Sequence, residues 1–142
     1  MSEQTPASDA PIEHLLSEWK QGMLTFWAMS LLALKPMYGL EIKKEIETST
    51  DGKMKLGVST IYQLLRRLEG RGLVESFWES TTQGPPRAYY RLSPSGRIVV
   101  QRYLSEVLSP TSPIAGALGR LTAALYRQFG FPGPGSQEKP KI

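Results

Sequence analysis

Apolar residues recur at intervals of three and four from Ile12 to Leu34. This spacing places them on one broad stripe of an α-helix. Pro11 suits the first turn of such a helix, and Lys35-Pro36 ends it because the residue before a proline is displaced from the helical region. The pattern predicts one long helix, or two helices with a break near Gly22.

Two shorter helices follow. The stretch "GLEIKKEIETS" (39–49) predicts a helix whose apolar residues are Leu40, Ile42 and Ile46 and whose water-facing residues are Lys43, Lys44, Glu45 and Glu47. The polar, glycine-containing stretch "TDGKMKLG" (50–57) predicts a turn. The next helix is expected to have Ser59 as its N-cap and Gly72 at a left-handed C-terminal cap. Its buried stripe would consist of Ile61, Leu64, Leu65 and Leu68.

A hairpin and two more helices complete the pattern. "LVESFWES" (73–80) and "AYYRLS" (88–93) are rich in β-forming residues, and "TTQGPPR" (81–87) supplies a turn between them. Ser93-Pro94 has the form of an N-cap followed by proline at the first helical position, and a helix is expected from there to Leu108. The residues from Ile114 to Phe129 predict a final amphipathic helix.

The order helix, helix, turn, helix, hairpin, helix is that of a winged helix-turn-helix. The expected fold is therefore mainly α with a small two-stranded antiparallel β-wing. We expect the N- and C-terminal helices to be dimerisation helices, because their apolar stripes exceed what so small a module can bury. Residues 1–11 are short, polar and proline-containing, which predicts a disordered arm. The expected DNA-binding domain covers 12–108, a C-terminal amphipathic dimerisation helix covers 109–130, and 131–142 form a flexible tail.

Charge is distributed unevenly along the chain. The 142 residues carry a formal charge of +4. Residues 1–34 contain one lysine and four acids, whereas residues 35–103 contain twelve Lys and Arg and seven acids. Such a split indicates that the middle of the chain meets a polyanion, although an ordinary basic surface would look the same.

The chain lacks the residues that several classes of protein function require. The chain has no cysteine and a single histidine, His14, so neither a disulfide nor a Cys- or His-cluster metal site is expected. Without a glycine-rich phosphate loop or paired carboxylates, we expect neither an enzyme nor a cofactor. The N-terminus has no basic signal region, and the apolar run Met23–Leu34 is far shorter than the roughly 20 residues of a membrane span. A cytoplasmic protein without a membrane partner is expected.

The helix after the turn carries the clearest candidate for recognition. Tyr62 and Arg66 lie four residues apart, as do Gln63 and Arg67, so each pair stacks along one side of a helix. Glutamine can pair with adenine and arginine with guanine in the major groove of DNA. Ser59 and Thr60, at the N-terminal end, suit a phosphate.

Alternative interpretations of this face remain open. Arg66 and Glu69 could form an i,i+3 ion pair on an ordinary solvated surface, and Tyr62 could cover the edge of the core. Arg87, beside Gly84-Pro85-Pro86, would put a basic residue at the tip of a stiffened hairpin, which suits contact with the DNA backbone or minor groove. The same Gly-Pro-Pro stretch could also be turn chemistry alone.

The chain resembles the PadR family of transcriptional regulators. Three segments carry the resemblance: "GMLTFWAMSLLALKPMYGLEI" (22–42), "LGVSTIYQLLRRLEGRGLVES" (56–76) and "GPPRAYYRLSPSGR" (84–97). The resemblance implies a dimeric winged-helix repressor that binds double-stranded DNA. It also implies a response to phenolic acids, hydrophobic drugs or other small effectors. Carried over by position, the DNA-binding candidates are Tyr38, Ser59, Thr60, Tyr62, Gln63, Arg66, Arg67, Arg87 and Tyr89.

The chain also departs from the family pattern. Leu40 stands where the family often has Tyr, Gln63 where it often has Pro, and Ala88 where a second basic residue is usual. Gln63 adds a polar group to the expected reading face, so the operator sequence cannot be borrowed. The loss of one wing charge at Ala88 predicts weaker contact between wing and phosphate.

Two apolar stripes exceed what so small a module can bury within itself. We assign Phe26, Leu31 and Leu34 mostly to the core. The homodimer interface is expected to contain Trp19, Leu118, Leu121 and Leu125. A flat aromatic or hydrophobic effector could bind between Trp19, Trp27 and the helix around residues 98–108.

A protein-interaction module is the alternative function, because winged helices are reused for binding proteins and the fold alone does not decide. In that case the basic surface would dock an acidic partner without reading DNA. Two adjacent arginines together with Gln and Tyr on one helix face favour the DNA-binding regulator.

Overall fold

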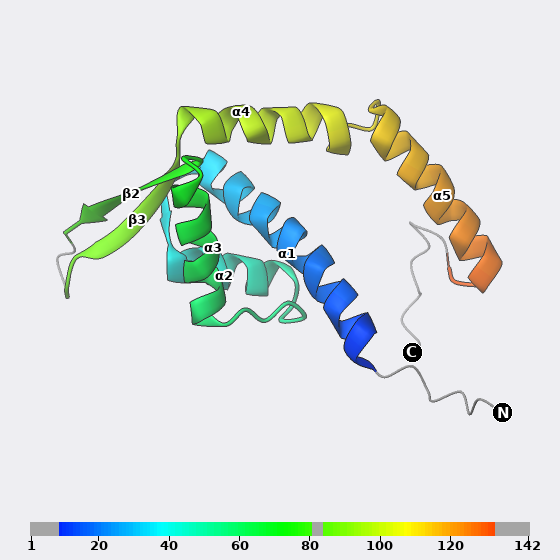
Figure 1. Cartoon of the computed structure of the whole chain (residues 1–142), viewed down its shortest axis with the longest axis horizontal. Coiled ribbons are helices and arrows are strands. Elements are labelled where there is room, and N and C mark those ends of the chain that lie inside the picture. The colour runs from blue at the N-terminus through cyan, green and yellow to red at the C-terminus, as the bar shows by residue number, and fades with distance from the viewer. Residues whose placement is uncertain (1–8, 81–83, 133–142) are drawn as a thin grey trace, which may run out of the picture. The chain divides into compact units, whose positions relative to one another are not determined.

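The computed structural model describes residues 9–80 and 84–132, which form parts of two compact units, Met1–Val100 and Gln101–Ile142. The first unit is a winged helix-turn-helix (Figure 1). Its elements are α1 (Asp9–Leu34), β1 (Met37–Tyr38), α2 (Gly39–Ser49), α3 (Val58–Gly70), β2 (Val74–Glu79), β3 (Arg87–Leu92) and the start of α4 (Pro94–Tyr103). The remaining elements are the π-helical turn η1 (Leu104–Leu108) and α5 (Pro113–Phe129).

The element order predicted from the sequence is confirmed, with shifted ends. Asp9–Pro11, assigned to a disordered arm, belong to α1, and Gly22 does not interrupt this helix. The helix expected to reach Leu108 ends as an α-helix at Tyr103 and continues as η1. Residues 1–8 of the arm, 81–83 of the hairpin turn and 133–142 of the tail lie outside the described residues.

Helix α1 buries a different face from the one we expected. Its core residues are Leu24, Ala28, Met29 and Leu32. Leu34 is 81% exposed, so its assignment to the core is wrong, while Phe26 and Leu31 are only half-buried. The stretch from Met23 to Leu34 is apolar on nearly every side, so its periodicity could not select the buried face. All residues from Ile12 to Gly22 are exposed.

The core of the first unit lies where three helices and the hairpin meet. Ile42 and Ile46 of α2 and Ile61, Leu65 and Leu68 of α3 are at most 1% exposed. Val74, Tyr90 and Leu92 extend this core onto the sheet, and Val100 closes it from α4. Leu40, expected among the apolar residues of α2, is 47% exposed.

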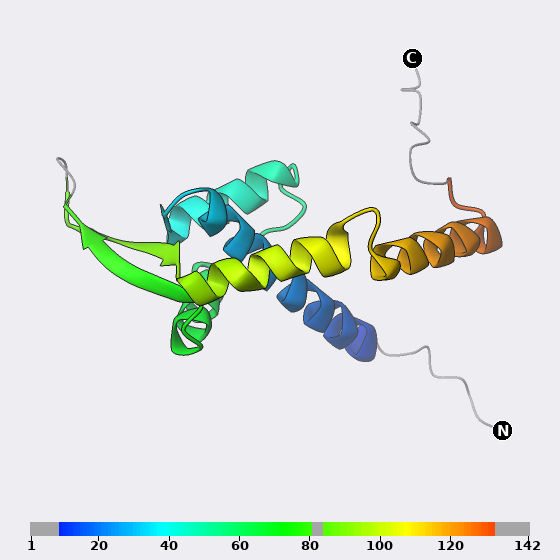
Figure 2. The ribbon, with the colours of Figure 1, turned by 90° about the horizontal axis from the view of Figure 1, so that it is seen from above.

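The wing is a three-stranded antiparallel sheet, not the two-stranded ribbon that the sequence predicts. Its order is β1-β3-β2, with Tyr38 paired to Tyr89 and Phe77 also paired to Tyr89. Strand β1 has only two residues, too few for a recognisable alternation, so only tertiary pairing reveals it. Strands β2 and β3 run outward from the helices in both views (Figures 1 and 2).

Side-chain caps and close contacts fix the segments around α3 and α4. Gly57, not Ser59, is the N-cap of α3, because the helix begins one residue before Ser59. Gly72 has φ +71° and follows the helix end, as the sequence predicts. Ser93 caps α4 through its Oγ, which accepts from the Gly96 amide at 3.0 Å. Gly96 packs so closely that an added Cβ would lie 2.1 Å from the Leu73 carbonyl oxygen.

The second unit has a well-capped helix without a core of its own. Ser112 Oγ accepts from the Ala115 amide at 3.0 Å, Pro113 opens α5, and Gly130 ends it at φ +72°. No side chain of α5 or η1 is buried. Its apolar stripe, 46–67% exposed, consists of Ile114, Leu118, Leu121, Leu125 and Phe129.

Within residues 9–80 and 84–132, no helix has an apolar stretch long enough to cross a bilayer.

Candidate nucleic-acid interface

Helix α3 presents a polar outer face because its inner face is fixed in the core. Ile61, Leu65 and Leu68 are at most 1% exposed. At about 100° per residue, the direction opposite them is occupied by Ser59, Gln63 and Arg66. All three of these side chains are exposed. An amide, a guanidinium and a hydroxyl on one outward surface are the groups that hydrogen-bond to base edges and phosphates.

The remaining α3 candidates lie on its flanks. Tyr62 is half-buried and packs against the core, with its ring over Gly39 at the start of α2. Thr60 is exposed and Arg67 is half-buried, and both line a narrow hollow with Gln21 of α1. Of the six predicted residues, Ser59, Gln63 and Arg66 therefore form the outward face, and Gln63 also borders this hollow.

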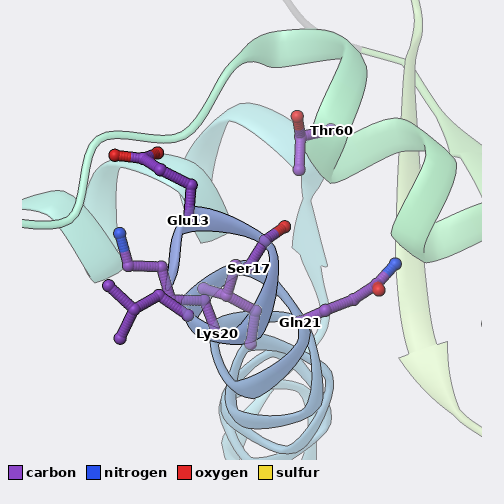
Figure 3. Close-up of a pocket in the computed structure, with 7 residues that line it drawn as sticks. Glu13, Ser17, Lys20, Gln21 and Thr60 are labelled. Atoms are coloured by element: carbon purple, nitrogen blue, oxygen red, sulfur yellow. The ribbon is translucent and has the colours of Figure 1, made fainter. Parts of the chain in front are cut away.

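A wider hollow lies between the N-terminal half of α1 and the side of α3 that carries Thr60. It has a volume of about 450 Å³. Figure 3 shows Thr60 on α3 opposite Glu13, Ser17, Lys20 and Gln21 of α1. With one carboxylate and one ammonium group, this hollow has no strong preference for an anion.

The two arginines of α3 are free to contact a ligand. The ion pairs among the described residues involve neither Arg66 nor Arg67. The alternative Arg66–Glu69 surface pair is therefore not formed. Arg66 is exposed and Arg67 half-buried, so Arg66 is the better placed of the two to meet a base.

On the wing, aromatic rings hold an arginine in place. Arg87 is the first residue of β3 and pairs with Glu79, so it lies at the start of a strand and not at the hairpin tip. Its guanidinium carbon is 4.6 Å from the centre of the Tyr38 ring. Tyr38 meets Tyr89 edge-on at 5.6 Å, and Tyr89 stacks on Phe77 at 5.8 Å. The structure therefore brings Tyr38, Arg87 and Tyr89 together, as one basic and aromatic group.

Glu47 fastens the turn that leads into α3. Its carboxylate accepts from Lys43 Nζ at 2.6 Å and from the Leu56 amide at 3.2 Å. Lys43 and Glu47 are thus partly buried partners, not the water-facing residues that the pattern of α2 predicts. The hydrogen bond from Lys43, followed by that from Leu56, lowers the pKa of Glu47 against the effect of desolvation. On β3, burial raises the pKa of the Tyr90 phenol.

Trp19 and Trp27, the residues predicted to bind an effector, do not come together within one chain. Trp19 is 64% exposed on α1, whereas Trp27 packs against the core. The two residues are eight positions apart on α1, which corresponds to a rise of about 12 Å along the helix axis. Neither indole is among the residues that line the hollows between α1 and α3 or the hollow between α1 and α2.

Residues 29–102, slightly more than half of the chain, match the model of the transcriptional regulator PadR-like family. The chain belongs to this family. A protein of Lysinibacillus sphaericus is 31% identical over 88 residues, which cover 62% of this chain and 77% of that protein. A PadR family transcriptional regulator from Eggerthella lenta DSM 2243 is 28% identical, with a TM-score of 0.61 over 81% of this chain and 95% of that one.

The PadR fold is also that of a structure solved with DNA. Bacillus subtilis PadR in complex with operator DNA has a TM-score of 0.53 over 75% of this chain and 62% of that chain. At 17% identity this similarity concerns the fold alone. The PadR fold positions α3 and the wing on one module, which agrees with the resemblance carried by the sequence motifs.

Two side chains near the PadR wing were not singled out by the sequence. Trp78 on β2 is 74% exposed and lines a hollow between α2, α3 and the wing, together with Lys44 of α2. The alternation of "VESFWE" places Val74, Ser76 and Trp78 on one face of β2, so a signal for Trp78 was present. No comparable signal distinguishes Lys44 from the other charged residues of α2.

Proposed function

We propose that this PadR-family chain is a homodimeric, sequence-specific DNA-binding regulator that acts as a repressor. In this proposal α3 enters the major groove, Gln63 and Arg66 read base edges, and Ser59 contacts a phosphate. Tyr38, Arg87 and Tyr89 position the wing on the backbone. Thr60, Tyr62 and Arg67 border the contact on the flanks of the helix.

The single observation that carries this proposal is the outward face of α3. Gln63 and Arg66 are exposed, while Ile61, Leu65 and Leu68 fix the opposite face in the core. Family membership and the fold shared with an operator-bound PadR support the same function. An interaction module has no comparable need for an unpaired arginine beside a glutamine on this face.

The proposed dimer rests on the second unit. Helix α5 buries none of its apolar stripe, and a 17-residue helix with an unburied stripe requires a partner to be stable. We propose that a second copy supplies it through Leu118, Leu121 and Leu125, together with Trp19 of α1. Two recognition helices would then meet successive major grooves about 34 Å apart on a roughly palindromic site.

Relief by a small aromatic or hydrophobic effector belongs to the same proposal. Because Trp19 and Trp27 do not converge within one chain, such a ligand would need surfaces from both copies. Binding would shift the population of dimers whose α3 helices fit the operator. Titration with planar aromatic compounds tests this part, and unchanged tryptophan fluorescence with every compound would contradict it.

The main test is selection of duplexes from a random pool by the full chain, followed by a gel-shift assay on the enriched sequence. The enriched duplexes are expected to share a half-site that is repeated in inverted orientation. Retention of the protein on heparin should fall steeply as the salt concentration rises. Selection that enriches no sequence, together with shallow salt elution, would contradict DNA binding and favour a protein-interaction module.

A further inference from the structure

A second hollow lies on the wing side of α3 and has a volume of about 470 Å³. It is bounded by α2, by α3 and by the outer part of the wing, where Trp78 pairs with Ala88. Residues from all three contribute to its walls, among them Tyr38, Leu40, Lys44, Tyr62, Trp78 and Arg87.

The walls of this wing-side hollow combine apolar surface with positive charge. Trp78 is 74% exposed and Leu40 is 47% exposed, so both offer apolar surface to a ligand. Lys44 and Arg87 supply two cations. The single carboxylate is that of Glu41, whose Oε1 accepts from the Tyr38 amide at 3.5 Å. The hollow therefore favours a ligand that is both anionic and partly apolar.

The position of Trp78 follows from the register of the wing. Trp78 pairs with Ala88, so it shares the sheet face of Val74 and Tyr90, which are core residues. It lies beyond the end of that core and therefore faces the hollow instead of the protein interior. Arg87 follows Pro86 at the border of the hollow and alternates with Ala88, so it belongs to the other sheet face with Tyr89. Its guanidinium carbon lies 4.6 Å from the centre of the Tyr38 ring. Both groups are thus placed before any ligand binds.

The geometry of a DNA duplex indicates which ligand would occupy the wing-side hollow. The major and minor grooves of DNA are separated by one sugar–phosphate strand. If α3 lies in the major groove and the wing reaches toward the neighbouring minor groove, the strand between these grooves must cross the space between α3 and the wing. That space is the wing-side hollow. A sugar–phosphate strand is anionic at its phosphates and apolar at its deoxyriboses, which matches the walls.

We propose that the wing-side hollow is a backbone-binding site for one DNA strand, in which Lys44 and Arg87 contact successive phosphates while Trp78 and Leu40 pack on the intervening sugars. This inference rests on the proposed DNA-binding function and adds Lys44, Trp78 and Leu40 to it. These contacts are independent of base sequence, so they operate on any duplex.

The test measures binding of the full chain to a random-sequence 30-base-pair duplex between 50 and 200 mM salt. Lys44→Ala should reduce the slope of log K against log salt by about 0.9 for each protomer bound. Trp78→Ala should lower affinity about fivefold at every salt concentration without changing the slope, because it removes apolar contact and no charge. Arg97→Ala, beyond the far end of β3, is the matched control and should keep the parent's slope.

Fluorescence supplies a readout that a structural role would not move. The chain has three tryptophans, and addition of the duplex should change the emission of the parent. The change should disappear in Trp78→Phe, which retains Trp19 and Trp27. Thermal melting of each variant identifies any loss of folding, which is not expected because Lys44 and Trp78 are exposed.

The outcomes separate this inference from the function on which it rests. If Lys44→Ala retains the parent's slope and Trp78→Ala the parent's affinity, while Arg66→Ala weakens binding to a selected duplex, the backbone site is wrong and DNA binding stands. If the parent binds no duplex at all, the proposed function fails, and the backbone site fails with it.

Discussion

The guanidinium group of Arg87 lies over the ring of Tyr38, with 4.6 Å between the guanidinium carbon and the ring centre. This contact joins the outer strand segment of the wing to the residue that precedes α2. Tyr38 is itself held by β-pairing with Tyr89 and by the edge-on contact of their rings. The position of Arg87 on the wing therefore depends on an aromatic residue far away in the sequence.

Removing this aromatic support should weaken DNA binding modestly. Tyr38→Leu should lower affinity about two- to fivefold, because an exposed cation–π contact contributes about 0.5–1 kcal/mol to holding Arg87 in place. Tyr38→Phe keeps the ring and should bind like the parent in a fluorescence-anisotropy titration. Equal losses in both variants would show that the hydroxyl, and not the ring, matters.

Arg87→Ala should weaken binding evenly across sequences. The variant loses a phosphate contact, so the slope of log K against log salt should fall by about 0.9 per protomer while the order of preferred sequences is retained. The measurement is a salt series on a selected operator and on a scrambled duplex. A loss confined to the operator would instead make Arg87 a base-reading residue.

Arg66→Ala should have the opposite signature. If Arg66 reads a base, affinity for the selected operator should fall by about 1–3 kcal/mol and discrimination at one position should relax, with little change on scrambled DNA. A gel-shift series against single-base operator variants measures this. Arg97→Ala serves as the charge-matched control, and operator binding by Arg66→Ala equal to that of the parent would contradict the assignment of α3 as the reading helix.

Glu47 should make stability depend on pH at the acidic end. Its folded-state pKa is lowered from 4.5, so its contribution is fully present above the unfolded-state value and is lost as pH falls below about 4.5 and through the lowered pKa. Glu47→Gln should therefore be less stable than the parent at pH 7, with a difference that shrinks toward pH 3. Urea unfolding across this range measures it, and a pH-independent difference would contradict the role of the carboxylate charge.

Two glycines in helices should respond in opposite ways to alanine. In Gly96→Ala the new Cβ would meet the Leu73 carbonyl oxygen at 2.1 Å, so the unfolding free energy should fall by about 1–3 kcal/mol or more. In Gly22→Ala the new Cβ meets nothing within 4 Å, and the gain in helix propensity should stabilise α1 by about 0.5–1 kcal/mol. Denaturant unfolding of both variants measures these changes in unfolding free energy. Because both carry the same Gly→Ala substitution, each variant serves as the control for the other.

The proposed dimer predicts a response confined to one side of α5. Sedimentation of the parent at micromolar concentration should give a dimer, and Leu121→Asp should shift it toward the monomer because a charge would be buried in an apolar seam. Arg127→Ala, on the opposite side of α5, should remain dimeric. A monomeric parent at this concentration would refute the interface of Leu118, Leu121 and Leu125.

The amphipathic elements were predictable because local chemistry decides them. The stripe Ile61, Leu65 and Leu68 fixed which side of α3 is buried, so the exposure of Gln63 and Arg66 followed from spacing alone. The caps at Gly72 and Ser93-Pro94 also depend on neighbours in the sequence, since they satisfy the free amides and carbonyls of a helix end. The motifs within residues 22–97, which resemble the PadR family, added the expectation that these elements assemble into a winged helix.

Tertiary packing decided what had no local signature. The segment from Met23 to Leu34 is apolar all round, so only contact with α2 and β3 could choose Leu24, Ala28 and Leu32 over Leu34 as core residues. Strand β1, the seat of Arg87 on Tyr38, and the bond from Glu47 to the Leu56 amide each join residues that no periodicity connects. Spacing along a helix determines which side chains share a face, but only the folded chain determines what that face meets.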